Sequence, residues 1–260
     1  MPGHKARKRF GQHFLSDPGV VDGILRAVHA TRDDVVVEIG PGLGAITTAL
    51  AASAGTLHAI EFDRDLVARL RRQYDGHPSV IIHEADALSF DFSTLGDRLR
   101  IVGNLPYNIS TPLLFHLLKF RDRIVDMHFM LQKEVVDRMA AGPGSKAYGR
   151  LGIMLGCHLH IESLFDVDRS AFSPPPEVTS AVVRLDPLPP GSFQIRNEAL
   201  LSKLVASAFM MRRKTIRNSL KELLEVRDLE AVGIDPGMRP EQVSIAKYVE
   251  LSNHLAASIR

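Results

Sequence analysis

The sequence contains only one cysteine, Cys157, in 260 residues. A single thiol excludes an internal disulfide and any metal site built from cysteines, and the histidines show no H-x-x-x-H or H-E-x-x-H spacing typical of zinc. No apolar run approaches the roughly eighteen residues of a membrane span, and the amino terminus lacks the apolar segment of a secretory signal. We therefore expect a protein of the reducing cytoplasm, with no metal and no membrane segment.

Basic residues are unevenly distributed, although the formal net charge is only +2. The first ten residues contain no acid, and a second basic run lies near the carboxyl end of the chain. Two basic segments at opposite ends of the chain indicate a polyanionic partner, of which nucleic acid is the main candidate. A solvated helix face and a loose tail are the structural alternative. The basic residues are Lys5, Arg7, Lys8, Arg9, Arg212, Arg213, Lys214, Arg217 and Lys221.

The chain is long enough for one large domain and one small domain. The segment 186–192 (DPLPPGS) is the clearest linker, because it combines three prolines with a glycine. Strand and helix patterns alternate before it, whereas only helical patterns follow it. We therefore predict a basic arm over 1–9, an α/β domain over 10–187 and an all-helical domain over 188–260.

A glycine-rich turn follows the first predicted strand. The apolar segment 34–39 (DVVVEI) runs directly into Gly40-Pro41-Gly42-Leu43-Gly44, ahead of an alanine-rich helix. Glycines in such a turn let the backbone and a helix amino terminus approach a ligand. The next strand, 56–60, ends in Glu61, about twenty residues after the first glycine, where an acid can accept both hydroxyls of a ribose. The pattern predicts a ribonucleoside cofactor.

The glycine turn lacks the features that hold a dinucleotide. A third glycine at the usual offset is missing, and residues 45–50 include no basic residue for a pyrophosphate. A cofactor without phosphates fits better, and S-adenosyl-L-methionine is such a cofactor. A third predicted strand, 79–83, is followed by Asp86, which could accept from an adenine amino group while the main chain of Ala87 meets ring nitrogen N1. A helix N-cap is the alternative role for Asp86.

Four residues, Asn104, Leu105, Pro106 and Tyr107, follow the buried strand predicted at 99–102. In open α/β sheets, ligands bind at this carboxyl edge. The Asn104 side chain and the Leu105 main chain each offer a carbonyl to an exocyclic amino group, the proline holds the turn, and Tyr107 offers a stacking face. The pattern favours transfer to the amino group of a flat ring. An Asx turn with a core tyrosine is the alternative.

Phe172 begins a stiff polyproline segment, 172–176 (FSPPP). A stiff segment of this kind could hold an aromatic side chain in place to stack on a flipped base. A crossover loop with a core phenylalanine is equally compatible with the sequence.

The glycine-rich segment 142–150 has two basic residues and is a candidate lid or RNA contact. The run 180–185 (SAVVRL) is expected to close the sheet. Another strand is expected at 125–131, and helices at 17–30, from 110 onward, at 133–140, 197–209, 213–224 and 241–258, with a short one near Leu229.

Several segments, in this order, resemble one protein family. They are FGQHFL, VEIGPGLG, NLPYNISTPLLFHLL, MLQKEVVDRM, GSKAYGRL, FSPPPEV and RRKTIRNSL. They look like the bacterial 16S rRNA adenine N6,N6-dimethyltransferases, the kasugamycin-sensitivity dimethylases, and the match covers essentially the whole chain. The glycine motif and NLPY are shared with many amino-group methyltransferases, whereas GSKAYGRL and RRKTIRNSL are far more selective.

The resemblance implies a Rossmann-like S-adenosylmethionine-dependent methyltransferase sheet with an antiparallel last strand, SAVVRL, and a small helical carboxyl-terminal domain. It implies dimethylation of N6 of two adjacent adenosines in a 3′-terminal hairpin of 16S rRNA, in the 30S subunit or its precursor, late in assembly. A monomer is expected. Two rivals remain: a 23S rRNA adenine N6-methyltransferase of the macrolide-resistance type, and a non-catalytic assembly or RNA-binding factor on the same fold.

By position, the family's cofactor-contacting residues match His13, Leu15, Gly40, Glu61, Asp86 and Asn104. The target-base pocket matches 104–107, with Phe172 as the second stacking face. Many members carry asparagine in place of His13; a side-chain contact there would make cofactor affinity depend on pH, whereas a main-chain contact would change nothing. The implied reaction is direct attack of adenine N6 on the sulfonium methyl, without a metal or a strong base.

Overall fold

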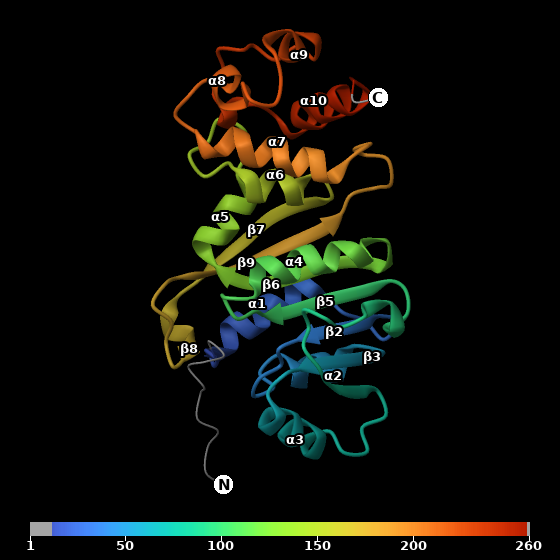
Figure 1. Ribbon diagram of the computed structural model, residues 1–260. Helices are drawn as coiled ribbons and strands as arrows, with labels where there is room; N and C mark the ends of the chain where they lie inside the picture. The colour runs from blue at the N-terminus through green and yellow to red at the C-terminus, as the bar shows by residue number, and fades with distance from the viewer. Residues whose placement is uncertain (1–11, 259–260) are drawn as a thin grey trace. The chain divides into compact units, whose positions relative to one another are not determined.

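A mostly parallel, seven-stranded sheet dominates the computed structural model, which describes residues 12–258 (Figure 1). The strand order is β4-β3-β2-β5-β6-β9-β7. The chain places β3 and β4 on one side of β2 but β5 and β6 on the other, so the order reverses beside β2, where α/β sheets open a ligand crevice. The strands are β2 (Val35–Ile39), β3 (Thr56–Glu61), β4 (Val80–Glu84), β5 (Leu99–Asn104), β6 (Ile124–Gln132), β7 (Leu159–Val167) and β9 (Ser180–Pro187).

The last strand of the chain, β9, is antiparallel to β6, as the family resemblance implies for SAVVRL, while β2 to β6 pair in parallel. The expectation that SAVVRL closes the sheet is wrong, because β7 lies beyond β9 at the edge. The sequence did not reveal β7. Glu162 and Asp166 interrupt its apolar pattern, and few of its residues are fully buried.

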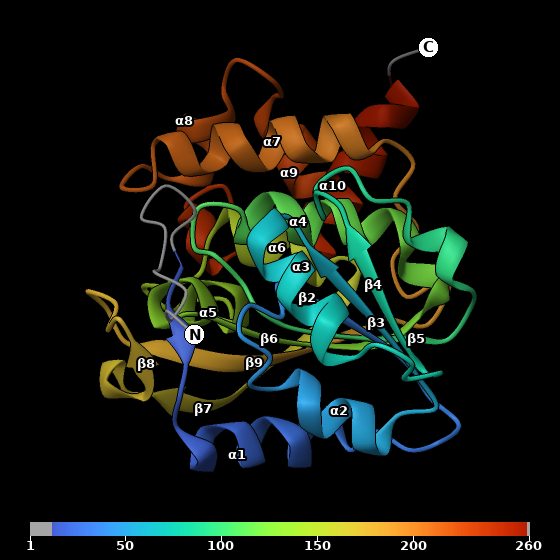
Figure 2. The same cartoon turned by 90° about the horizontal axis from the view of Figure 1, so that it is seen from below.

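Two helices cover one face of this sheet: α1 (Pro18–Val28) and α2 (Thr47–Ser53) (Figure 2). The predicted start of α1 is confirmed, because the Asp17 side chain accepts hydrogen bonds from the main-chain N–H groups of Gly19 and Val20. Apolar side chains of both helices pack against the sheet. This cluster includes Ile24, Val28, Val36, Leu50, Ala51, Leu57, Val102, Met130 and Val182.

Further helices connect the strands: α3 (Arg64–Gln73), α4 (Ser110–Leu117) and α5 (Lys133–Ala140). A separate two-stranded ribbon joins distant parts of the chain. In it, β1 (Phe14–Leu15) pairs antiparallel with β8 (Phe172–Ser173), so that Leu15 lies opposite Phe172. The ribbon therefore fixes the residues around His13 to the FSPPP segment.

The chain divides into two compact units. Unit 1 runs through Val136 and includes Glu162–Pro187, whereas unit 2 consists of Asp137–Ile161 and the residues from Leu188 onward. The segment 137–161 thus groups with the carboxyl-terminal helices, although the sequence analysis assigned it to the α/β domain. The basic arm proposed at 1–9 lies outside the described residues.

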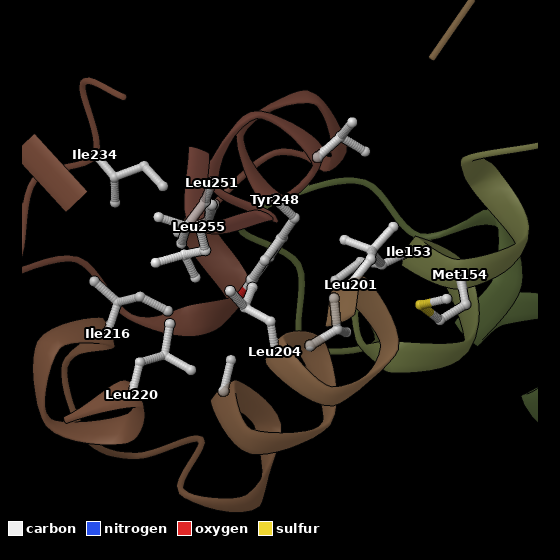
Figure 3. Packing of buried hydrophobic residues seen from close by; sticks show 14 of the residues in the cluster. Ile153, Met154, Leu201, Leu204, Ile216, Leu220, Ile234, Tyr248, Leu251 and Leu255 are labelled. Atoms are coloured by element: carbon white, nitrogen blue, oxygen red, sulfur yellow. The ribbon is translucent and has the colours of Figure 1, made fainter. Parts of the chain in front are cut away.

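Unit 2 is helical, with α6 (Arg150–Gly156), α7 (Glu198–Met210), α8 (Ile216–Leu220), α9 (Val226–Ala231) and α10 (Ile245–Ser258). Its side chains converge on one core (Figure 3). Ile153 and Met154 of α6 belong to this core, which explains why 137–161 groups with unit 2. The helix expected at 213–224 is shorter than predicted, because Thr215 is extended and the N–H of Ile216 binds the carbonyl of Met238.

Gly103 lies where β2 and β5 pair near their carboxyl ends, opposite Ile39. A Cβ atom at this position would lie 2.6 Å from the Ile39 main-chain oxygen and 3.1 Å from a methyl group of Leu105. We expect Gly103→Ala to lower the free energy of unfolding by about 1–3 kcal/mol, because the Ile39 oxygen belongs to the backbone and cannot retreat unless the strand moves. Urea unfolding tests this. Gly142→Ala is the control, since its Cβ would meet nothing within 4 Å. Equal losses in both variants would contradict the argument.

Candidate functional site

A cavity of about 260 Å³ opens at the carboxyl ends of β2, β3 and β5, where the strand order reverses. Five segments contribute its lining: the β1 region, the glycine turn, the end of β3, the loop after β4 and the turn after β5. Every predicted site residue except Phe172 lines this cavity. These residues are His13, Leu15, Gly40, Glu61, Asp86, Asn104, Leu105, Pro106 and Tyr107. The structure thus brings together residues that are up to 94 positions apart in the sequence, from His13 to Tyr107.

Glu61 ends β3 with its carboxylate almost buried, at 8% exposure. One oxygen accepts from the main-chain N–H groups of Phe62 (2.9 Å) and Asp63 (2.8 Å), and the other accepts from Gly42 (3.2 Å). Gly42 can make this approach because its φ of 59° suits glycine. Burial raises the pKa of Glu61, against the opposing effect of these hydrogen bonds. A carboxylate accepts about four hydrogen bonds, so one position stays available for a ligand hydroxyl.

Glu38 is a cavity residue to which the sequence analysis assigned no role. Its side chain is 2% exposed, and Oε2 has no hydrogen bond among residues 12–258. Burial raises the pKa of Glu38 to about 7. The nearby Thr47 hydroxyl lowers this pKa, whereas the negative charge of Glu61 raises it further. The Thr47 hydroxyl lies close enough to favour the ionised form but makes no hydrogen bond of normal geometry. The signal in the sequence was an acid two residues before Gly40, inside an otherwise apolar strand.

Asn104 is oriented by the residues before α1. Its Nδ2 donates to the main-chain oxygen of His13 at 2.9 Å, which leaves the side-chain carbonyl for a ligand. The N–H of Leu105 donates to the carbonyl of Met130 at 3.2 Å, which ties this turn to β6. The carbonyls of Asn104 and Leu105 are thus on neighbouring residues that both line the cavity.

The rings of His13 and Tyr107 lie nearly parallel, with centroids 6.0 Å apart and an interplanar angle of 24°. The Tyr107 hydroxyl is 2.9 Å from the Ser180 Oγ, and the His13 Nδ1 donates to the carbonyl of Pro174 at 2.9 Å. Within the protein, the main-chain oxygen of His13 accepts from Asn104, and its imidazole donates to the carbonyl of Pro174.

Asp86 is exposed at the cavity rim, and its Oδ1 accepts from the N–H of Leu88 at 2.9 Å. The local turn therefore occupies one oxygen and leaves the other for a ligand.

Phe172 is only 3% exposed and packs in the same apolar cluster as Leu15. It is absent from the cavity lining, so the structure shows the core phenylalanine that the sequence analysis held as the alternative to a base-stacking residue.

The glycine turn, the acids at the ends of β3 and β4 and the carbonyl-bearing turn after β5 together define an S-adenosylmethionine-dependent methyltransferase that acts on an amino group. The residues fit this cofactor: Glu61 suits a ribose hydroxyl, and the unpaired oxygen of buried Glu38 suits a cation. The family model for ribosomal RNA adenine dimethylase matches residues 3–257. The chain belongs to this family and is an adenine dimethyltransferase with S-adenosylmethionine as its methyl donor.

Individual relatives agree with this assignment. The chain is 55% identical over 257 residues to the "Ribosomal RNA small subunit methyltransferase A" of Aromatoleum aromaticum, covering 99% of this chain and 97% of that protein. A dimethyladenosine transferase from Plasmodium falciparum superposes with a TM-score of 0.80 at 26% identity, covering 92% and 96% of the two chains. The 23S rRNA methyltransferase ErmE superposes with a TM-score of 0.75 at 25% identity, covering 94% and 99%.

Among residues 12–258, no helix has the length and apolar character to cross a bilayer. The same residues include no group of three or more histidine, cysteine or carboxylate side chains placed to hold a metal ion.

The raised pKa of Glu38 predicts a pH-dependent stability. Its folded value of about 7 lies above the ordinary 4.5, so the folded state binds the extra proton and stability falls as pH rises from about 4.5 to 7. We expect Glu38→Gln to remove this loss, which is on the order of 3 kcal/mol. Urea unfolding of both proteins at pH 5 and pH 8 measures it. A stability difference between them that is the same at both pH values would refute the assignment.

Proposed function

We propose that this protein dimethylates N6 of two adjacent adenosines in a 3′-terminal hairpin of 16S rRNA, within the 30S subunit or its precursor, late in subunit assembly. The name of the Aromatoleum aromaticum relative, at 55% identity over nearly the whole chain, supports the small subunit as the target. The single structural observation that carries the proposal is the pair of carbonyl acceptors at Asn104 and Leu105 beside the cavity. We place the protein in the cytoplasm, as a monomer.

The cavity residues divide between cofactor and base. S-adenosylmethionine, when bound, supplies a methyl group on a positively charged sulfur. In our proposal Glu61 accepts from a ribose hydroxyl, Asp86 accepts from the cofactor's adenine amino group, and the main chain at Ala87 meets its ring nitrogen N1. The main chain near Leu15 and Gly40 completes the binding surface. The position of each residue in the cavity lining supports these roles.

The target base requires a different set of contacts. The Asn104 and Leu105 carbonyls accept hydrogen bonds from the two N–H groups of adenine N6, which leaves the nitrogen lone pair free to attack. Stacking on Tyr107 holds the ring, a contact worth roughly 1–3 kcal/mol. Extruding the base costs a few kcal/mol, whereas correct positioning of the reacting atoms supplies roughly 7–11 kcal/mol of the barrier reduction. No strong base is needed, because the amine displaces a neutral thioether from a sulfonium cation, and the methylated nitrogen is then acidic enough to lose its proton to water.

The sequence-based role of Phe172 is not part of this proposal. The ring would have to leave the apolar cluster around Leu15 to reach a base in the cavity. Full burial of a phenylalanine side chain is worth about 1.5–3 kcal/mol, and this stability would be lost on each binding event.

Removing the Asn104 side chain isolates its contribution to the transfer step. We expect Asn104→Ala to reduce kcat by roughly 10²–10³-fold, the range observed when one preorganised hydrogen-bonding group is removed from a transition state. Cofactor affinity should stay largely intact, because the backbone and Glu61 still bind the ligand. Single-turnover methyl transfer and calorimetry with S-adenosylmethionine measure the two effects. Near-normal turnover would show that the acceptor assignment is wrong.

Radiolabelled methyl incorporation tests the proposed function itself. We expect the purified protein to methylate 30S particles that lack the modification, and nucleoside analysis to recover N6,N6-dimethyladenosine. Purified 50S particles are the matched substrate control. Incorporation into 50S alone would favour the 23S rRNA alternative, to which ErmE, at 25% identity, is the relevant structural relative. Tight binding to 30S particles without incorporation would instead favour a non-catalytic assembly factor.

A further inference from the structure

We propose that His116 is a positioning residue for S-adenosylmethionine, because its imidazole holds the loop that carries the contacts to the cofactor's adenine. This loop, residues 85–90, follows β4. His116 lies on α4 and is not among the residues that line the cavity, so it acts through the loop and not by touching the cofactor. The inference rests on the cofactor roles proposed above for Asp86 and Ala87.

One hydrogen bond joins α4 to the end of the loop. The His116 Nε2 lies 2.8 Å from the main-chain oxygen of Phe90, and the imidazole is the donor because a carbonyl can only accept. This bond spans 26 residues. Hydrogen bonds inside the loop are local: the N–H of Leu88 donates to the Asp86 side chain at 2.9 Å, and the N–H of Ser89 to the Asp86 main-chain oxygen at 3.1 Å. The local bonds shape the turn, whereas the His116 bond fixes its place relative to α4.

The start of the loop is attached to a different element. The N–H of Ala85 donates to the main-chain oxygen of Glu61 at 3.0 Å, at the end of β3. The part of the loop that lines the cavity, residues 86–88, therefore lies between two attachments, one to β3 and one to α4. Asp86 is exposed, so burial does little to hold its carboxylate in place. Loss of either attachment would let this carboxylate move relative to the rest of the cavity.

Aromatic rings fix the orientation of the His116 imidazole. The rings of Phe92 and Phe120 lie 5.9 and 5.3 Å from it between centroids, inclined by 58° and 71°. Such inclined contacts are favourable for aromatic side chains. Phe92 is fully buried and also meets the ring of Phe90 edge-on at 5.2 Å. Packing in this cluster, with the hydrogen bond incidental, is the competing explanation for His116.

The helix that carries His116 also begins at the turn proposed to receive the target base. Ser110 starts α4, and its Oγ donates to the main-chain oxygen of Tyr107 at 3.1 Å. His116 lies in the last turn of the same helix. One short helix therefore places both the turn for the base and the loop for the cofactor's adenine. Methyl transfer requires the two ligands in a fixed relation, and the His116 bond contributes to that relation.

Two variants of the full-length protein separate hydrogen bonding from packing. His116→Phe keeps an aromatic ring but has no donor for the Phe90 carbonyl, whereas His116→Gln keeps an N–H donor at a similar reach but has no ring. His116→Leu also lacks a donor and replaces His116→Phe if thermal unfolding shows that His116→Phe does not fold. His160→Phe is the control, because His160 is exposed on β7 and is not part of the cavity lining.

Calorimetry measures S-adenosylmethionine affinity, and steady-state methyl transfer to unmodified 30S particles measures kcat and the KM of each substrate. We expect His116→Phe to weaken cofactor affinity and raise the cofactor KM by roughly 2- to 12-fold, the range for one hydrogen bond, with kcat and the KM of the particles within about twofold. His116→Gln should bring cofactor affinity close to the wild-type value, and His160→Phe should match wild type.

Unchanged cofactor affinity in His116→Phe would overturn the inference. So would a His116→Gln variant at least as impaired as His116→Phe, since that order assigns His116 to packing, or a fall in kcat as large as the loss of affinity. Failure of the proposed cofactor roles is distinguishable by Asp86→Ala. If that variant keeps wild-type cofactor affinity, the loop itself has no such role; if it loses affinity while His116→Phe does not, only the role of His116 is refuted.

Discussion

One hydrogen bond, from the Asn104 side chain to the His13 main-chain oxygen, determines the form of this site. An amide can present either its donor or its acceptor to a ligand, and this bond occupies the donor. The acceptor that remains is the group an amine requires. The same bond attaches the residues before α1 to the end of β5, so the region that covers the cofactor cavity and the group that receives the substrate are positioned together.

Burial of negative charge is the second constraint on the cavity. Glu38 and Glu61 both lie near strand ends with pKa values raised chiefly by burial, and the charge of Glu61 adds to the rise at Glu38. Glu61 is compensated by three main-chain N–H groups, whereas an oxygen of Glu38 has no partner within residues 12–258. A buried carboxyl without a partner reduces stability. The same feature suits a cationic cofactor, which would supply the missing counter-charge.

The sequence predicted the local features of the fold well, and the long-range ones less well. The strand ending in Glu61 and the helix starting after Asp17 were predictable because their patterns are local. Strand β7 was missed because its apolar pattern is interrupted. The burial of Phe172 was undecided, because a polyproline segment such as FSPPP can either support an exposed aromatic side chain or form a crossover loop with a buried one. The Asn104 to His13 bond spans 91 residues, and no spacing rule predicts a contact of that kind.

Side chains that line the cavity are held by contacts between residues far apart in the chain. The bond from His13 to Pro174 spans 161 residues, and the one from Tyr107 to Ser180 spans 73. Closing such long loops costs conformational entropy before any contact compensates for it. A growing polypeptide could form β2 and β3 with their glycine turn early, but it has no complete site until the segment around Pro174 has left the ribosome. Catalytic competence is therefore acquired at a late stage of folding, after most of unit 1 has been synthesised.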